Sequence, residues 1–240
     1  MRDRPRFLAM VTGVLAGLVI CGTGNAQTEQ DVRQHIAKAY GIQSWAQVEQ
    51  LRFTFRVQRG KEQRSRSWMW EPKTDRVSFQ GADKQGKPVK LTYLRSELNA
   101  QPTQELKEID ASFINDQYWL LFPFHLVWDR AAKVEDTGMH ELPRGPGNGR
   151  RVVVTYPPNG GYTPGDVYEL FVGEDGRIIQ WAYHQGGAPK PTLAASWEEN
   201  RHLGPLVVSL NHPSAKGDVR VWFTEVAVKL AGSERWIAAN

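Results

Sequence analysis

The chain has 240 residues, of which 40% are hydrophobic and 23% are charged. This composition excludes intrinsic disorder, a collagen-like repeat and a membrane protein with several spans, and the length is compatible with one large domain. The net charge is +4, and because residues 1–26 contain three arginines and one aspartate, residues 27–240 carry only +2. Such a small excess argues against a nucleic-acid partner.

The first 26 residues have the pattern of an export signal. Three arginines precede an uncharged stretch from Phe7 to Ile20, and small residues follow up to Ala26. A stretch of 14 residues falls short of the ~20 that span a bilayer. We therefore predict a signal peptide over 1–26, cleavage after Ala26, and a single domain over 27–240 in the periplasm or outside the cell.

The chain has one cysteine, Cys21, at a position where a lipoprotein could carry its lipid anchor. Bulky Ile20 precedes it and disfavours recognition by the lipoprotein peptidase, so anchoring through Cys21 is the weaker alternative to cleavage after Ala26. Residues 27–240 contain no cysteine in either case. Disulfides, a thiol nucleophile and a cysteine-ligated zinc are therefore excluded from the domain.

The domain opens on a predicted amphipathic helix. Residues 28–31 have the pattern of a capping box, and Val32, Ile36 and Ala39 follow at helical spacing. Gly41 comes directly afterwards, and glycine commonly ends a helix. We expect the helix to begin at the capping box and to end before Gly41.

Most of the remaining chain has the pattern of antiparallel strands. In the first strand, Phe53, Phe55 and Val57 alternate with polar residues, as in a strand with one buried face. In the last, the apolar residues change phase near Thr224 and Glu225, which predicts a β-bulge. Short turns join the segments into a meander rather than βαβ units. The further strand patterns lie at 63–70, 75–80, 88–95, 150–156, 166–172, 177–184, 193–200, 205–210 and 218–230.

One helical segment interrupts the strands, at 103–128. Thr103 opens it, and apolar residues follow at helical intervals up to the stretch 118–126, which Pro123 divides. Residues 133–149 are rich in glycine, proline and charge and predict a weak strand and an exposed loop. The sequence thus predicts an α+β fold in which a curved antiparallel sheet is capped by an N-terminal helix and a helical insert.

Aromatic residues are frequent, with nine tryptophans, nine phenylalanines and seven tyrosines. A sheet of this many strands curls, and its interior is then either filled by side chains or keeps a cavity for an apolar ligand. His184, at the end of one aromatic strand, is expected at the rim of such a hollow. The residues expected to line it and bind a ligand are Trp68, Trp70, Phe79, Tyr93, Trp119, Phe122, Trp181, Tyr183 and Trp222.

A few short segments carry a family resemblance, in the same order along the domain. They are Asn115–Leu121 with Pro123–Leu126, Tyr162–Leu170 with Asp175–Gly176 and Trp181–Tyr183, Trp197–Glu199 and Phe223–Val228. Together these segments resemble a group of secreted bacterial proteins related to the outer-membrane lipoprotein carrier and receptor, LolA and LolB. The resemblance implies a half-open, strongly curved antiparallel β-barrel capped by helices, whose hollow in the carriers holds the acyl chains of lipoproteins.

Patterns for catalysis or metal binding are weak. The six histidines have no metal-ligand spacing, and the serine motif GxSxG is absent. Asp166 with Glu169, or Glu198 with Glu199, could act in glycoside hydrolysis, but such pairs are common and Asp166 has the position of a turn-capping carboxylate. We therefore expect no catalytic residue, no metal and no cofactor.

A basic cluster lies along the first two strands. We interpret it as a solvated sheet face rather than a binding patch, because an acidic residue interrupts it. Its members are Arg52, Arg56, Arg59, Lys61, Arg64 and Arg66.

The leading hypothesis is an exported envelope protein that binds a lipid, an acyl chain or another amphipathic molecule in an apolar hollow, as a lipid or lipoprotein carrier would. We expect a monomer with no nucleic-acid partner and leave contact with a membrane surface open. Two alternatives remain: an enzyme, either a hydrolase or an isomerase, that uses the same hollow, and an envelope scaffold or accessory protein that works through its outer surface.

Overall fold

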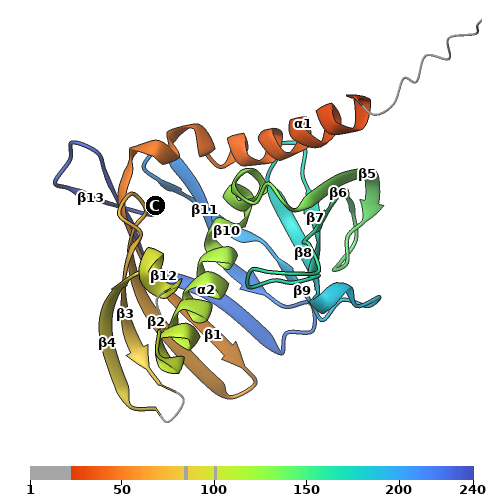
Figure 1. The fold of residues 1–240 in the computed structure, drawn as a ribbon. Coiled ribbons are helices and arrows are strands. Elements are labelled where there is room, and N and C mark those ends of the chain that lie inside the picture. The colour runs from red at the N-terminus through yellow and green to blue at the C-terminus, as the bar shows by residue number, and fades with distance from the viewer. Residues whose placement is uncertain (1–22, 84–85, 100–101) are drawn as a thin grey trace, which may run out of the picture.

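The computed structural model describes residues 23–83, 86–99 and 102–240. Cys21 and most of the predicted signal peptide lie outside these residues, so the division into 1–26 and 27–240 stays a prediction. The described strands pair antiparallel in two sheets that curve around a central helix without closing into a barrel (Figure 1). The predicted α+β class with a strongly curved antiparallel sheet is confirmed.

The larger sheet has eight strands. Its order is β10 (Glu198–Leu203), β11 (Leu206–Pro213), β12 (Val219–Leu230), β1 (Val48–Arg59), β2 (Glu62–Glu71), β3 (Arg76–Ala82) and β4 (Pro88–Leu94), and β13 (Trp236–Ala238) pairs with β12. Because β1 pairs with β12, two meanders from the two halves of the chain join into one sheet. The predicted uninterrupted meander does not account for this pairing.

The smaller sheet is one meander of five strands. Its order is β5 (Lys133–Glu141), β6 (Asn148–Thr155), β7 (Val167–Val172), β8 (Ile178–His184) and β9 (Leu193–Ser196). The segment 193–200, predicted as one strand, divides at Trp197 into β9 of this sheet and β10 of the larger one. One chain segment therefore connects the two sheets on one side of the molecule.

Helix α2 (Gln104–Trp128) is the predicted insert and lies between the two sheets (Figure 1). The hydroxyl of Thr103 accepts a hydrogen bond from the Leu106 N–H at 3.2 Å, so the predicted start is confirmed. The helix bends at Leu121, whose φ is −118°. Pro123 explains the bend, because proline has no N–H for the helical ladder and its ring crowds the preceding turn.

Helix α1 (Thr23–Ala39) begins before the predicted capping box, so that predicted start is wrong. Once a helix has formed, adding a further turn costs little, and the residues before the box extend it. Its predicted end is confirmed. Gly41 follows at φ +85°, and a Cβ at this position would lie 2.4 Å from the carbonyl oxygen of Pro205, so only glycine fits there.

Three short 3-10 helices complete the described elements: η1 (Ile42–Gln47), η2 (Arg95–Asn99) and η3 (Gln185–Gly187). The predicted bulge in β12 is confirmed, since the pairing of β1 with β12 shifts between Arg52 and Thr54, and Glu225 opposite has φ +56°. β5 extends over nine residues, further than the predicted weak strand. β13 had no counterpart in the sequence patterns.

Aromatic side chains fill most of the space between α2 and the sheets. The Phe113 ring of α2 lies 5.3 Å from the Trp68 ring of β2, and the Trp119 ring lies 4.5 Å from the Trp181 ring of β8. Phe122 is completely buried and lies 5.5 Å from Trp181. The central interior is therefore a packed core and not a hollow.

Candidate functional site

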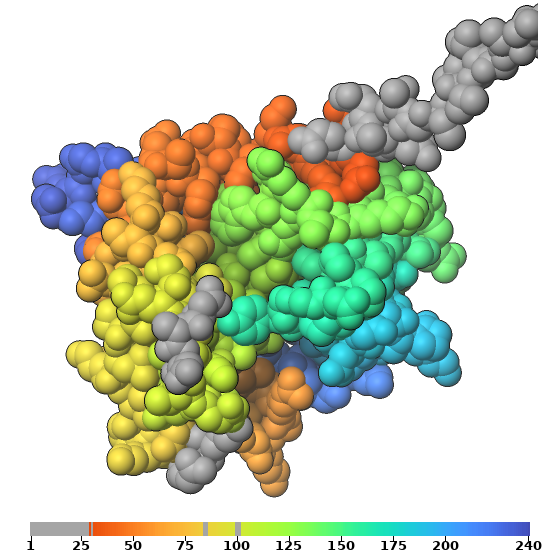
Figure 2. Space-filling view, in the orientation of Figure 1, coloured from red at the N-terminus to blue at the C-terminus, as the bar shows by residue number. Residues whose placement is uncertain are grey.

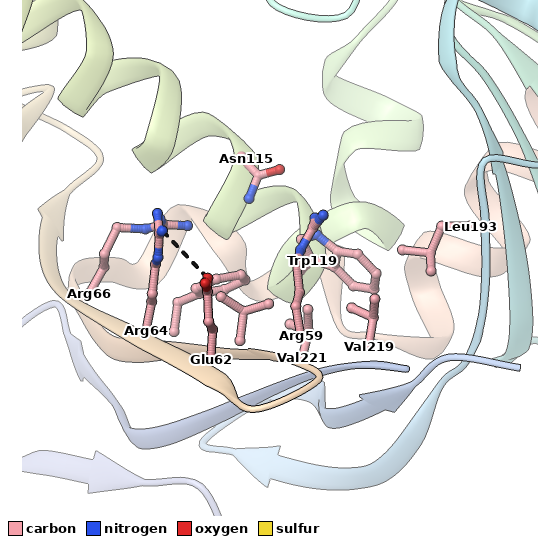
Figure 3. Close-up of a pocket in the computed structure, with 11 residues that line it drawn as sticks. Arg59, Glu62, Arg64, Arg66, Asn115, Trp119, Leu193, Val219 and Val221 are labelled. Carbon is pink, nitrogen blue, oxygen red and sulfur yellow. Dashed lines mark ion pairs between the residues drawn. The ribbon is translucent and has the colours of Figure 1, made fainter. Parts of the chain in front are cut away.

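The interior is open at one end, beside the tip of the β1–β2 hairpin. In the space-filling view this tip (orange) projects at the lower edge of the molecule (Figure 2). A pocket of about 390 Å³ lies between the hairpin, α2, β9 and β12 (Figure 3). Its lining residues are Phe55, Val57, Arg59, Glu62, Arg64, Arg66, Asn115, Trp119, Leu193, Val219 and Val221.

The alternation of side chains along β1 and β2 explains the composition of this pocket. Directly opposite residues of two strands have their side chains on the same face of a sheet. Phe55 pairs with Arg66, Val57 with Arg64, and Arg59 with Glu62. The face that carries aromatic residues in the core thus carries charged residues at the tip of the hairpin.

The floor of the pocket is apolar. Phe55 and Val221 are buried, and Val57 pairs with Val221 across β1 and β12. Trp119 projects from α2 on the opposite side, as Figure 3 shows. These side chains can cover an apolar group of a ligand without leaving any polar group of the protein unpaired.

One arginine of the lining is held by a buried ion pair. The Arg66 guanidinium donates two hydrogen bonds to Asp116 of α2, the one from Nε at 2.6 Å, and lies 4.8 Å from the Phe55 ring. Burial raises the pKa of the Asp116 carboxyl, and hydrogen bonds from Arg66, Asn115 and Trp68 offset only part of this effect. A carboxylate with so many donors accepts a bidentate arginine as an ion, and the pair links β2 to α2.

The two other arginines of the lining, Arg64 and Arg59, have no buried acidic partner among the described residues. Arg64 has a single acidic neighbour, Glu62, at 3.7 Å, and the two side chains are 74% and 78% exposed. Arg59 is paired in the sheet through its backbone, and its side chain makes no hydrogen bond or ion pair with any residue in the described part of the chain. In Figure 3 both arginines rise from the hairpin toward α2, so their guanidinium groups lie at the mouth, beside the apolar floor.

A buried histidine lies close to this floor. His212 of β11 pairs with Val221, and its ring lies 4.2 Å from the Trp197 ring and 5.5 Å from the Trp119 ring. Burial lowers its pKa to about 3, although the nearby backbone of Ser196 and Ser209 offsets part of the effect. The imidazole is therefore neutral at ordinary pH, and the region beneath the pocket carries no charge from it.

A second cavity, of about 720 Å³, lies on another side of α2. Its lining includes Trp45, Trp70 and Trp128 together with His125 and Asp129. The rings of Trp45 and Trp128 are 4.8 Å apart, so they pack against each other and leave no slot between them.

Several polar groups of this second cavity form hydrogen bonds with one another. Asp129 Oδ2 accepts hydrogen bonds from the hydroxyls of Tyr118 and Tyr156 and lies 3.0 Å from His125 Nδ1, while His125 Nε2 lies 2.9 Å from Gln117 Oε1. Burial raises the Asp129 pKa, whereas these hydrogen bonds and the histidine lower it. The second effect is the larger, so the pKa lies below its usual value. Since both nitrogens of His125 are engaged, it has no free position from which to accept a substrate proton.

The structure distributes the nine predicted ligand-binding residues over several places, and their role stays a prediction. Trp119 lines the pocket at the hairpin tip and Trp70 the second cavity. Two others make hydrogen bonds through their polar atoms: Tyr93 to Asp110 at 2.8 Å and Tyr183 to Asp166 at 3.0 Å. Four are buried in the aromatic core: Trp68, Phe79, Phe122 and Trp181.

Trp222 is the one predicted lining residue on the outer face of its sheet. Its neighbour Phe223 is buried, and the Arg220 guanidinium lies 4.9 Å from the Trp222 ring. Successive side chains of a strand point to opposite faces, so Trp222 points away from the interior. His184, predicted at the rim, is buried at the end of β8, with Nδ1 2.7 Å from the Ala188 carbonyl oxygen, and does not line the pocket at the hairpin tip.

The sequence interpretation missed the arginines of the pocket. Arg59, Arg64 and Arg66 were assigned to a solvated sheet face with the rest of the basic cluster. Continuing the alternation of Phe53, Phe55 and Val57 by two residues would have placed Arg59 on the inner face. Arg56, by contrast, lies on the outer face and donates a hydrogen bond to the Thr224 hydroxyl at 3.0 Å.

The remaining chemical candidates have structural partners. Asp166 accepts a hydrogen bond from the Gly186 N–H at 2.7 Å, which confirms its turn-capping position. Glu198 accepts hydrogen bonds from Ser196 and Asn211. In the part of the chain that the structure describes, no three histidine, cysteine or acidic side chains form a possible metal site. None of the described helices is long and apolar enough to cross a membrane.

Comparison with known proteins gives similarities of fold. No family model matches the chain, and no curated protein matches its sequence. Similar solved structures include a DUF1329 family protein from Desulfovibrio piger, with 7% identity and a TM-score of 0.48 over 88% of this chain and 96% of that one.

Two further similar structures carry the names of the family that the sequence resembles. One is a LolA superfamily protein from Nitrosomonas europaea, with 7% identity and a TM-score of 0.47 over 82% of this chain and 92% of that one. The other is an outer membrane lipoprotein-sorting protein domain from Vibrio parahaemolyticus, with 6% identity and a TM-score of 0.46 over 88% and 96%.

Proposed function

We propose that this protein is an exported envelope protein that binds the apolar part of an amphipathic molecule, such as an acyl chain, in the pocket at the tip of the β1–β2 hairpin. A role as a lipid or lipoprotein carrier in the periplasm, or on a membrane through Cys21, would follow from such binding. The observation that carries the proposal is the apolar floor of Phe55, Val57 and Val221 in the pocket beside the packed aromatic core.

The size of the pocket supports this proposal. Ligand pockets of proteins typically enclose roughly 300 to 1,000 Å³, and this one encloses about 390 Å³. Each methylene group that leaves water contributes about 0.8 kcal/mol, whereas association costs on the order of 4 to 15 kcal/mol. A short alkyl chain would therefore not bind measurably, and affinity should rise with chain length until the pocket is filled.

The proposal is tested by a chain-length series. Native mass spectrometry of the protein, purified without detergent, first shows whether it carries a lipid. Calorimetric titration with alkyl alcohols of six to fourteen carbons then measures the affinity of each chain. We expect each added methylene to tighten binding by about fourfold, from ~0.8 kcal/mol, up to a plateau. Absence of binding at every chain length would refute the proposal.

A pair of matched variants tests whether the alkyl chain occupies this pocket. Val57→Phe adds four side-chain carbons to the floor. We expect it to weaken binding of the longest chains by about tenfold or more, because they lose the space they occupy. Gln58→Phe places the same ring on the outer, exposed face of the same strand. If the two variants bind equally well, the chain does not occupy this pocket.

A further inference from the structure

From the arginines at the mouth we infer that the pocket selects single-chain amphiphiles with an anionic headgroup, such as a carboxylate, and that Arg59 and Arg64 bind this headgroup while the chain lies on the apolar floor. The inference rests on the proposed function and names the class of ligand. It follows from three features of the pocket: the side of the sheet on which the arginines lie, the charge left unpaired at the mouth, and the geometry of a guanidinium.

The first feature is the position of the arginines relative to the floor. Arg64 pairs with Val57 across the hairpin, and Arg59 pairs with Val219 across β1 and β12. Paired residues share a face of the sheet, so the side chain of each arginine leaves the backbone next to an apolar side chain of the pocket. A ligand held by these two arginines would have its headgroup at the mouth and its chain directed along Val57 toward Phe55.

The second feature is the charge balance. Asp116 neutralises Arg66 through two hydrogen bonds. Glu62 is the one acidic residue of the lining and faces both Arg59, its pairing partner, and Arg64. Two cations therefore share one exposed carboxylate, and an exposed ion pair at 3.7 Å is weak enough for a ligand anion to replace it. The mouth keeps one net positive charge for a ligand.

The third feature is the chemistry of arginine. A guanidinium presents several N–H donors in a plane and binds a carboxylate or a phosphate through paired hydrogen bonds. A neutral hydroxyl headgroup can accept only ordinary hydrogen bonds from it, and a cationic headgroup is repelled.

The test compares headgroups on one chain length by calorimetric titration at pH 8, below the micelle concentration of each probe. Dodecanoate, dodecanol and dodecyltrimethylammonium share the alkyl chain, and acetate supplies the carboxylate alone. We expect the affinity for dodecanoate to exceed that for dodecanol by about tenfold or more, in line with hydrogen bonds to a charged group. The ratio of the two affinities should fall as salt is added. Dodecyltrimethylammonium should bind more weakly than either.

Two double variants locate the effect. Arg59→Gln with Arg64→Gln should reduce the ratio of dodecanoate to dodecanol affinity to within about twofold of unity. Arg52→Gln with Arg56→Gln removes the same charge from the outer face of β1, where Arg52 lies over Trp236, and should retain the ratio. An equal decrease in both variants would show that the overall charge of the protein acts, and would overturn the inference.

The remaining outcomes separate this inference from the proposed function. Equal binding of dodecanoate and dodecanol would overturn the inference and leave the apolar pocket as the site. Acetate binding as tightly as dodecanoate would also overturn it, because the arginines would then form an anion site without a chain. If no probe with an alkyl chain binds, both the inference and the proposed function fail.

Discussion

Replacing His212 by leucine should remove much of the acid sensitivity of this protein. Burial among aromatic rings lowers the pKa of His212 from 6.5 to about 3. Between these two values the unfolded chain holds one proton that the folded protein does not. The free energy of unfolding therefore decreases as the pH falls below 6.5, by about 1.4 kcal/mol per pH unit from this residue. Because the unfolded histidine is only half protonated at pH 6.5, lowering the pH from 6.5 to 4.5 should cost about 2 kcal/mol.

At neutral pH the same substitution should be neutral or stabilising. Neither ring nitrogen of His212 has a hydrogen-bond partner among the described residues, and a buried polar group without a partner costs about 1 to 3 kcal/mol. Leucine has a similar volume and no polar atom, so His212→Leu should raise the free energy of unfolding at pH 7.5 by up to about 2 kcal/mol, or leave it unchanged.

The assay is urea unfolding followed by circular dichroism at pH 4.5, 5.5, 6.5 and 7.5. His202→Gln, which removes an exposed histidine of β10, is the control. Wild type and the control should lose stability together as the pH falls, whereas His212→Leu should lose about 2 kcal/mol less between pH 6.5 and 4.5. If the leucine variant follows the wild-type pH dependence, His212 is not buried and neutral as described, and the reasoning is refuted.

Two further substitutions test the packing that holds the pocket, and both are read from urea unfolding. Asp116→Ala should lower the free energy of unfolding by about 3 kcal/mol, because Arg66, whose side chain is only 23% exposed, is left without its counter-ion; a change below about 0.5 kcal/mol would contradict the buried ion pair. Gly41→Ala should cost at least about 2 kcal/mol, since the new Cβ would lie 2.4 Å from the Pro205 oxygen at a φ of +85°; a neutral effect would show that the contact is absent.

Local patterns predicted the elements of this fold well, because the signals for them lie within a few residues. Thr103 marked the start of α2, Gly41 the end of α1, and the change of phase near Glu225 the bulge in β12. In each case one side chain or one backbone angle decides the local structure. The pairing of β1 with β12 had no such signal, because it depends on contacts between residues far apart in the chain.

The site was harder to predict than the fold, for a related reason. Aromatic residues alone do not distinguish a ligand surface from a core, and Trp68 and Phe122 are buried. A shift of one residue also changes the face on which a side chain lies, as for Trp222 beside the buried Phe223. The segment 193–200 was difficult for another reason. The chain changes sheets at Trp197, and no nearby residue indicates this change.

The place of the pocket follows from where the inner face of the β1–β2 hairpin changes in character. Toward the core this face carries paired aromatic residues such as Phe53 and Trp68, which pack against α2. The next inward position on β2 is Arg66, which can remain partly buried only because Asp116 neutralises it. Beyond it, Arg64 has no buried partner and stays in water, so α2 and the hairpin cannot close over it. The opening is thus a consequence of unpaired inward-facing charge, and the same charge makes an anionic headgroup the natural complement of the pocket.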